Sequence, residues 1–110
     1  MARFIKGDVI VLPFPFSDLS ASKRRPALVL ADLMGSDIIL CQITSQHTKD
    51  AYAISLTDSD MINGSLKKAS NIRPNRIFTA DKNIILYKIG SIASAKSQEV
   101  RNKIIEILDQ

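Results

Sequence analysis

The sequence predicts a single mainly β domain, a small barrel of short strands with one α-helix at its C-terminal end. Over the first two thirds of the chain, short apolar and β-branched runs alternate with turn-rich segments. The last stretch changes period, because Val100, Ile104, Ile107 and Leu108 recur at i, i+4, i+7 and i+8, on one face of a helix. Many short strands followed by a terminal helix indicate a sheet that closes on itself, with the helix packed alongside.

Three strands and one long loop are expected in the N-terminal half. The β-branched run at residues 8–12 predicts a strand that ends at Pro13, because proline cannot donate to a central ladder. Residues 14–25 are too many and too polar for a tight hairpin turn, and loops of this length are often functional. The apolar run 26–31 begins with a proline, which suits the first position of a strand, and a turn then leads into a strand at 37–44.

The second half of the chain predicts further short strands and the helix. A polar segment at 57–69 contains the turn signal Asn63-Gly64-Ser65, and Pro74 divides the β segments that follow it. Ser94 is the expected N-cap of the helix. The expected strands are 52–56, 70–73, 76–79 and 88–92.

Length and composition fit one globular domain covering residues 1–110. Hydrophobic residues make up 45% of the chain and charged residues 24%, so we expect an ordered protein with a substantial core. The net charge of +4 suits a polyanionic partner, although many small proteins carry as much without one. The apolar run at 9–16 is short and interrupted by prolines, which argues against a signal peptide or a membrane span and favours a cytoplasmic protein.

Cysteine and histidine usage predicts no metal site. Cys41 is the only cysteine and lies in an apolar run, so we expect a buried, unreactive thiol and no internal disulfide. A zinc site needs several cysteine or histidine ligands, and the chain has one of each. Asp58 and Asp60 are close in sequence, but no third ligand follows at a suitable spacing, and both are expected in turns. We therefore expect neither a metal nor another cofactor.

The basic run Lys23-Arg24-Arg25 is the first candidate for chemistry. Adjacent residues of an extended chain point to opposite sides, so Arg24 and Arg25 cannot both face the same groove. An arginine at a loop–strand junction presents a planar fork of donors that matches phosphate oxygens. A solvated charge cluster is the simpler interpretation of three adjacent basic residues.

A second candidate group lies at the end of the expected strand that contains Cys41. Strand alternation puts Cys41 on the core face, which leaves Gln42 and Thr44 at a polar surface. The Thr44 hydroxyl could donate to a phosphoryl oxygen, or it could occupy an ordinary strand position. His47, the single histidine, could act as a general base because its usual pKa is near neutral, although its neighbours indicate an exposed turn.

Arg73 and Arg76 form another basic region, with Phe78 close by and Lys82 beyond it. Aromatic side chains stack on bases and cations bind phosphates, so this region could line a nucleic-acid track or be an ordinary basic surface. The sequence contains no phosphate-binding glycine-rich loop and no nucleophile elbow.

Seven runs of the chain, taken in order, form a recognisable set. They are Lys6-Gly7-Asp8-Val9-Ile10-Val11, Pro15-Phe16-Ser17-Asp18-Leu19-Ser20, Lys23-Arg24-Arg25-Pro26-Ala27-Leu28-Val29-Leu30, Ile43-Thr44-Ser45, Ser70-Asn71-Ile72-Arg73, Phe78-Thr79-Ala80-Asp81-Lys82 and Lys88-Ile89-Gly90. Together they resemble the MazF/PemK-like toxin family, the RNA-cutting component of bacterial type II toxin–antitoxin pairs. The resemblance covers most of the chain, while the C-terminal helix is matched only by type.

This resemblance implies an SH3-like barrel that works as a homodimer, with single-stranded RNA across the dimer face and a cognate antitoxin as its inhibitor. It implies Arg25 and Thr44 as the catalytic pair. Family members are endoribonucleases that cleave without metal: the ribose 2′-hydroxyl attacks the adjacent phosphate, leaving a cyclic phosphate and a free 5′-hydroxyl. The candidate RNA-binding residues are Phe16, Ser17, Lys23, Arg24, Gln42, Ser45, His47, Arg73 and Arg76.

Two other functions stay open at this point. A non-catalytic toxin of the same barrel class could bind a protein target such as DNA gyrase. Such relatives depend on apolar and aromatic residues near the end of the C-terminal helix, whereas this chain ends Ile107-Leu108-Asp109-Gln110. A degenerate barrel could bind RNA or a partner without cleaving it. For cleavage itself, Arg25 fits an electrostatic stabiliser better than a general base, because a guanidinium is essentially always protonated.

Overall fold

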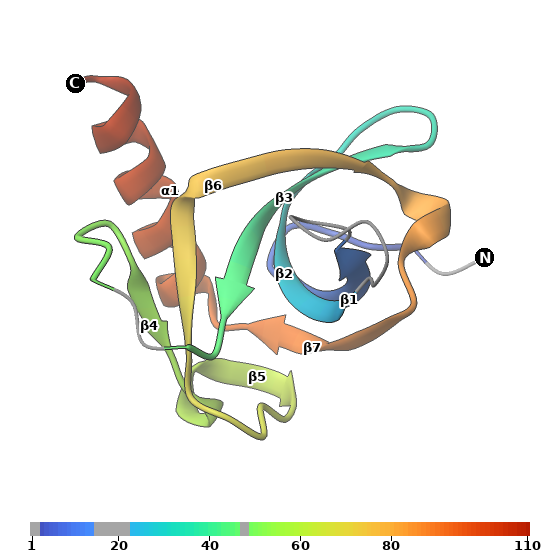
Figure 1. Ribbon diagram of the computed structural model, residues 1–110, viewed down its shortest axis with the longest axis horizontal. Helices are drawn as coiled ribbons and strands as arrows, with labels where there is room; N and C mark the ends of the chain where they lie inside the picture. Colours follow the sequence, from blue (N-terminus) through green and yellow to red (C-terminus); the bar gives the residue numbers. More distant parts are fainter. Residues whose placement is uncertain (1–2, 15–22, 47–48) are drawn as a thin grey trace.

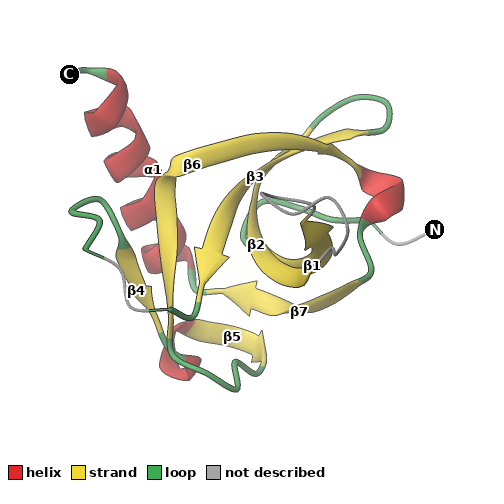
Figure 2. Ribbon diagram, viewed as in Figure 1, coloured by secondary structure: helices red, strands yellow, loops and turns green. Residues whose placement is uncertain are grey.

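A computed structural model describes residues 3–14, 23–46 and 49–110, which form a curled sheet with a helix beside it (Figure 1, Figure 2). The strands in this described part are β1 (Asp8–Phe14), β2 (Lys23–Asp32), β3 (Asp37–Thr44), β4 (Ile54–Leu56), β5 (Met61–Gly64), β6 (Ser70–Asp81) and β7 (Tyr87–Ile92). The helices are the short 3₁₀ turns η1 (Asp58–Asp60) and η2 (Lys82–Ile84) and the α-helix α1 (Ser94–Leu108). No described helix has the length and apolar character needed to cross a membrane.

The strands belong to one antiparallel sheet in the order β4-β6-β3-β2-β1-β7-β5. Figure 1 shows how strongly this sheet curls, with β6 and β7 arching around β1 and β2, and α1 standing beside β6. Within the described ranges the edge strands β4 and β5 do not pair with each other, so the barrel is partly open. The predicted mainly β barrel with a C-terminal helix is confirmed, and the predicted closure of the sheet is incomplete.

Two apolar clusters lie on opposite faces of the central strands β1, β2 and β3. The cross-strand neighbours Val9, Leu28 and Cys41 point into the first cluster, to which α1 contributes Val100. Because both faces are buried, the central strands are continuous apolar runs and do not alternate with polar residues. The second cluster consists of Ile10, Leu12, Phe14, Ala27, Val29, Ile38 and Leu40.

Strand alternation predicted that Gln42 and Thr44 lie at a polar surface, whereas the face of β3 that carries them is mostly apolar. Ile38 and Leu40 on the same face are 0% exposed, and polar side chains begin only where the second cluster ends. Thr44 itself is 8% exposed, so it is buried rather than open at the surface. The candidate residues of β3 thus lie at the border of a core.

β1 and β2 are longer than the sequence predicted, because both continue through a proline. Pro13 pairs with Arg24, and Pro26 pairs with Val11. Each proline lies beyond the ladder on the other side of its strand, since β1 pairs with β7 only as far as Val11 and β2 pairs with β3 only from Ala27. A missing N–H is tolerated there because no neighbouring strand needs it. The basic run of β2 consequently belongs to a paired strand and not to the loop.

β6 is one strand, where the sequence predicted two short strands on either side of Pro74. Its pairing with β3 shifts at this proline, from Ile77 opposite Cys41 to Arg73 opposite Gln42. The three intervening residues form a bulge, which lets a residue without an N–H lie outside the ladder. Arg73 is thereby the arginine that faces the end of β3.

β5 lies in a segment that the sequence predicted as a polar loop. Gly64, expected in a turn, has a φ of +69° and still pairs with Gly90 of β7. A Cβ atom on Gly64 would lie 2.1 Å from the Ile89 carbonyl oxygen, so the close approach of β5 to β7 requires a glycine. The glycine that looked like a turn signal therefore allows a strand pair.

The helix α1 begins at Ser94, the residue that was predicted as its N-cap. The N-cap is Ala93, whose carbonyl oxygen accepts a hydrogen bond from the Ser97 N–H at 3.0 Å. Val100 and Ile104 of the predicted apolar helix face pack on the first cluster. Leu108, predicted on the same face, is instead 75% exposed at the end of the helix.

Cys41 is fully buried in the first cluster, and burial raises the pKa of its thiol to about 12. Because the thiolate is the reactive form, we expect no reaction with a disulfide reagent such as DTNB in native buffer at about pH 8. Unfolding in urea should then release one equivalent of chromophore, measured by absorbance. Rapid labelling of the folded protein would contradict the buried, protonated thiol.

Candidate nucleic-acid interface

Arg25 and Thr44 project from the same face of the sheet, at the adjoining ends of β2 and β3. Ala27 of β2 pairs with Gln42 of β3. Arg25 lies two residues before Ala27, and Thr44 lies two residues after Gln42, so both side chains continue on the face of that pair. Arg25 is half-buried and pairs on its other side with Leu12 of the second cluster. The two residues named as a catalytic pair are therefore brought to one place.

The Thr44 hydroxyl is held in a defined orientation. Its Oγ1 atom accepts a hydrogen bond from the Gln46 N–H at 3.2 Å. A hydroxyl has one donor proton and two acceptor lone pairs, so this contact leaves the proton of Thr44 for donation. Asn71 of β6 pairs with Thr44 and is half-buried on the same face. The site thus presents an oriented hydroxyl at the edge of the core.

Arg73 joins this face because it pairs with Gln42. Its Nε atom donates to Asp50 Oδ2 at 3.2 Å, and the two side chains are 20% and 8% exposed respectively. The terminal amino groups of the guanidinium contact no other carboxylate in the described parts of the chain. The Nε atom of the Arg73 guanidinium is therefore fixed, and its terminal N–H groups can donate to an anion such as phosphate.

Asp50 is the carboxylate that holds Arg73. Its Oδ1 atom accepts a hydrogen bond from the Tyr52 N–H at 2.9 Å. Burial by itself would raise the pKa of Asp50, but the Tyr52 N–H, the Arg73 guanidinium and the Asn75 side chain outweigh it and lower the pKa below 3.8. Asp50 is consequently ionised at neutral pH, and the pair with Arg73 is a charged one.

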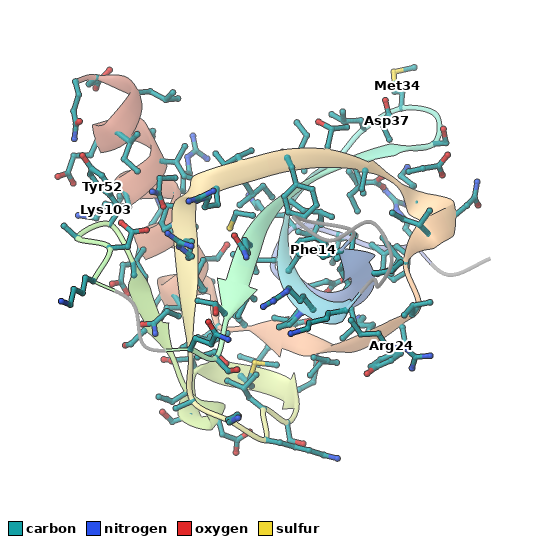
Figure 3. The ribbon with its side chains drawn as sticks, viewed as in Figure 1. Phe14, Arg24, Met34, Asp37, Tyr52 and Lys103 are labelled. Carbon is teal, nitrogen blue, oxygen red and sulfur yellow. The ribbon has the colours of Figure 1, made fainter. Side chains whose placement is uncertain are left out.

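The other basic residues of β2 diverge as alternation predicted. Lys23 pairs with Phe14 and shares the face of Arg25, whereas Arg24 pairs with Pro13 on the opposite face. Both side chains are exposed. In Figure 3, Phe14 lies within the curl of the sheet and Arg24 lies at its periphery. Arg24 is therefore separated from the face of Arg25 and Thr44.

The remaining candidates lie around this cluster or outside the described residues. Arg76, in the β6 bulge, lines a hollow of about 190 Å³ together with Gln42, Ile77 and Phe78. Ser45 is exposed directly after β3. Phe16, Ser17 and His47 lie outside the residues that the structure describes.

Two residues of the site were missed from the sequence. Asn71 lay in one of the family-like runs, Ser70-Asn71-Ile72-Arg73, but only its pairing with Thr44 indicates a place in the site. Asp50 is one of the neighbours of His47 whose sequence indicates an exposed turn. The separation of 23 residues between Asp50 and Arg73 hides their contact from any local pattern.

Removing the charge of Asp50 should destabilise the fold in a pH-dependent way. We expect Asp50→Asn to lower the free energy of unfolding by about 1–3 kcal/mol near neutral pH, because Arg73 loses its buried partner. A carboxyl with a lowered folded pKa stabilises above its ordinary pKa of 3.8 and loses that contribution as the pH falls through the folded value. The difference between parent and variant should therefore shrink below pH 3.8.

Urea unfolding near pH 7 and near pH 3 measures this difference. The exposed Asp37 offers a matched control, and Asp37→Asn should change the free energy of unfolding by less than about 0.5 kcal/mol. Equal destabilisation by Asp50→Asn at both pH values would show that charge is not the cause.

Solved structures with the same architecture include several toxins. A mycobacterial endoribonuclease in complex with its cognate antitoxin superposes with a TM-score of 0.75 at 14% identity, covering 97% of this chain and 96% of that one. A MazE–MazF complex from Deinococcus radiodurans gives 0.74 at 18% identity over 97% of both chains. The Mycobacterium tuberculosis toxin MazF-mt6 gives 0.72 at 16% identity over 93% and 96%. At these identities the likeness shows a shared fold.

Sequence comparison shows the family of the chain. No curated protein matches the sequence significantly. Residues 5–108, nearly the whole chain, match the family described as PemK-like, MazF-like toxin of type II toxin-antitoxin system. The chain therefore belongs to this family of PemK-like, MazF-like toxins.

Proposed function

We propose that this chain is the toxin of a type II toxin–antitoxin pair and a metal-independent endoribonuclease acting on single-stranded RNA such as mRNA. The observation that carries the proposal is the convergence of Arg25, Thr44 and Arg73 on one face, where the start of β2, the end of β3 and the adjoining part of β6 meet. Family membership and the endoribonucleases among the solved neighbours support the same reaction class.

The reaction needs charge stabilisation more than it needs a nucleophile from the protein. The 2′-hydroxyl oxygen attacks the adjacent phosphorus, the bond from phosphorus to the 5′-oxygen breaks, and the products are a cyclic phosphate and a 5′-hydroxyl. Negative charge builds on the phosphoryl oxygens in the transition state. The planar fork of Arg25 and the oriented hydroxyl of Thr44 donate hydrogen bonds to those oxygens.

Arg25 acts in this scheme as an electrostatic stabiliser and not as the general base. Cleavage requires that the 2′-hydroxyl proton is removed and that the leaving 5′-oxygen gains one. A guanidinium stays protonated in proteins, so it cannot accept the first proton. Arg73, held by Asp50, adds a further positive charge that positions the RNA backbone.

The partners follow from the family. We propose that a cognate antitoxin inhibits the toxin by covering the face of Arg25 and Thr44, that the toxin works as a homodimer and that it acts in the cytoplasm. The complexes with antitoxins among the solved neighbours support the first of these partners.

Sedimentation equilibrium tests the assembly. The purified chain should sediment at about twice its chain mass of 12.2 kDa, because the RNA face is proposed to span two subunits. A single species at the chain mass, across the concentrations used for cleavage, would contradict the homodimer.

Substitutions at the site test the reaction. Arg25→Ala and Thr44→Val should each lower kcat for cleavage of single-stranded RNA in EDTA by about 100- to 1,000-fold, because each removes a donor to the transition state. Thr44→Ser, which keeps the hydroxyl, should retain most of the activity. Arg24→Ala removes the same charge from the opposite face and should leave kcat unchanged. Cut sites are mapped on a long RNA, and new 5′-hydroxyl ends are detected by kinase labelling without prior phosphatase treatment.

Two outcomes would overturn this proposal. Cleavage by Arg25→Ala at the rate of the parent would show that the site is wrong. A parent protein that leaves RNA intact but stabilises cleaved DNA with gyrase and supercoiled plasmid would instead be a gyrase poison. Circular dichroism of each variant separates loss of chemistry from loss of fold.

A further inference from the structure

A second cleft, of about 350 Å³, lies next to the candidate catalytic pair. Two of its lining residues, Pro26 and Ser45, directly follow Arg25 and Thr44 in the sequence. The other described lining residues come from the segment between β5 and β6, from the start of β6 and from β7: Ser65, Leu66, Lys67, Lys68, Ser70, Tyr87 and Ile89. Since adjacent residues of a strand point to opposite sides, the strand ends form a ridge between this cleft and the face of Arg25.

The chemistry of the cleft suits a single-stranded nucleic acid. Lys67 and Lys68 are exposed, neither makes an ion pair within the described ranges, and no acidic residue is among the lining residues. Tyr87 is 52% exposed, so its ring is open to stacking. Basic grooves with exposed aromatic rings bind single strands because cations hold the phosphates and rings stack on the bases.

The two lysines are carried by an anchored connection. The Leu66 N–H donates to Asp58 Oδ1 at 2.8 Å, and the Ser70 hydroxyl donates to the Lys68 carbonyl oxygen at 2.9 Å. Leu66 also packs against the first apolar cluster. The connection is therefore tied down on both sides of Lys67, which lowers the entropy lost when a ligand binds.

We propose that this cleft is a subsite for RNA nucleotides that flank the scissile phosphate. Lys67 and Lys68 contact backbone phosphates, and Tyr87 stacks on one base. The strand crosses the ridge at Pro26 and Ser45, so that its scissile phosphate reaches Arg25 while its neighbours occupy the cleft. This inference rests on the proposed endoribonuclease function and adds a determinant of affinity that lies outside the catalytic face.

The salt dependence of RNA binding tests the two lysines. The probe is a single-stranded RNA that contains a mapped cut site with a 2′-deoxy sugar at the scissile position, which prevents cleavage. Each lost phosphate contact reduces the slope of log affinity against log salt by about 0.7. Lys67→Gln/Lys68→Gln should therefore flatten the slope by about 1.4 relative to the parent. The control Lys6→Gln/Lys103→Gln makes the same charge change elsewhere, with Lys103 on the helix side in Figure 3, and should leave the slope unchanged.

The aromatic contact is tested separately. Tyr87→Ala should weaken binding of the same RNA by about 5- to 150-fold, whereas Tyr87→Phe should bind like the parent, because only the ring is used. An RNA shortened to the nucleotides around the cut should bind parent and Tyr87→Ala equally. On the cleavable long RNA, the effect of Tyr87→Ala should appear in KM and leave kcat unchanged.

An unchanged salt slope in the lysine variant would overturn the subsite. So would a fall in kcat of Tyr87→Ala without a change in its affinity for RNA. If the lysine variant binds RNA like the parent but no longer binds polyglutamate, the cleft accepts an acidic peptide and the inference is wrong. A parent protein that neither binds nor cuts RNA would instead overturn the proposed function itself. In the results that overturn only the subsite, the parent protein still cleaves RNA, so the two failures are distinguishable.

Discussion

The central strands β1, β2 and β3 bury both of their faces, and this constraint decides where polar chemistry can occur. A polar group inside either apolar cluster would lose its hydration without gaining a partner. Polar side chains can therefore gather only beyond the last apolar position of a face. On the face of the second cluster this position in β2 is Ala27, which pairs with Gln42 of β3. Arg25 and Thr44 lie two residues past that pair, at the border of the core. A hydrogen bond to a phosphate is stronger there than in open water, because the surrounding dielectric is lower.

The same border explains why Arg73 needs Asp50. A half-buried guanidinium loses part of its hydration, and an unpaired buried charge costs several kcal/mol, as an order of magnitude. Asp50 compensates Arg73 through one nitrogen and is itself satisfied by the Tyr52 N–H. The pair thus fixes the direction of the Arg73 fork while its remaining donors stay on the face of Arg25 and Thr44. Full burial of the pair would have hidden those donors, and full exposure would have left Arg73 free to turn away.

Elements that depend on a local sequence pattern could be predicted from the sequence. Features that depend on contacts between residues far apart in the chain could not. The strand Asp37–Thr44 and the apolar face of α1 follow from turn signals and periodicity, and both were predicted. The strand boundaries predicted at Pro13 and Pro26 were wrong. A strand accepts a proline where no neighbouring strand needs its N–H, and this depends on where the neighbouring ladders stop. Alternation separated Arg24 from Arg25, but the choice of Arg25 and Thr44 as a pair came from family resemblance. The shared face that unites them depends on strand register, which no local signal encodes.

The two proposed tasks, cleavage and binding of the flanking RNA, are carried by elements of different rigidity. Arg25 and Thr44 are held by paired strands and by the second apolar cluster, so their positions change only if the sheet changes. Lys67 and Lys68 belong to a connection whose anchors are Leu66 and Ser70, and the lysine side chains themselves contribute nothing to either core. Substitution of these lysines should therefore change the proposed RNA contacts without a cost in packing. The proposed chemistry thus lies on the strands, whereas the proposed flanking contacts lie on a loop, where changes of sequence are better tolerated.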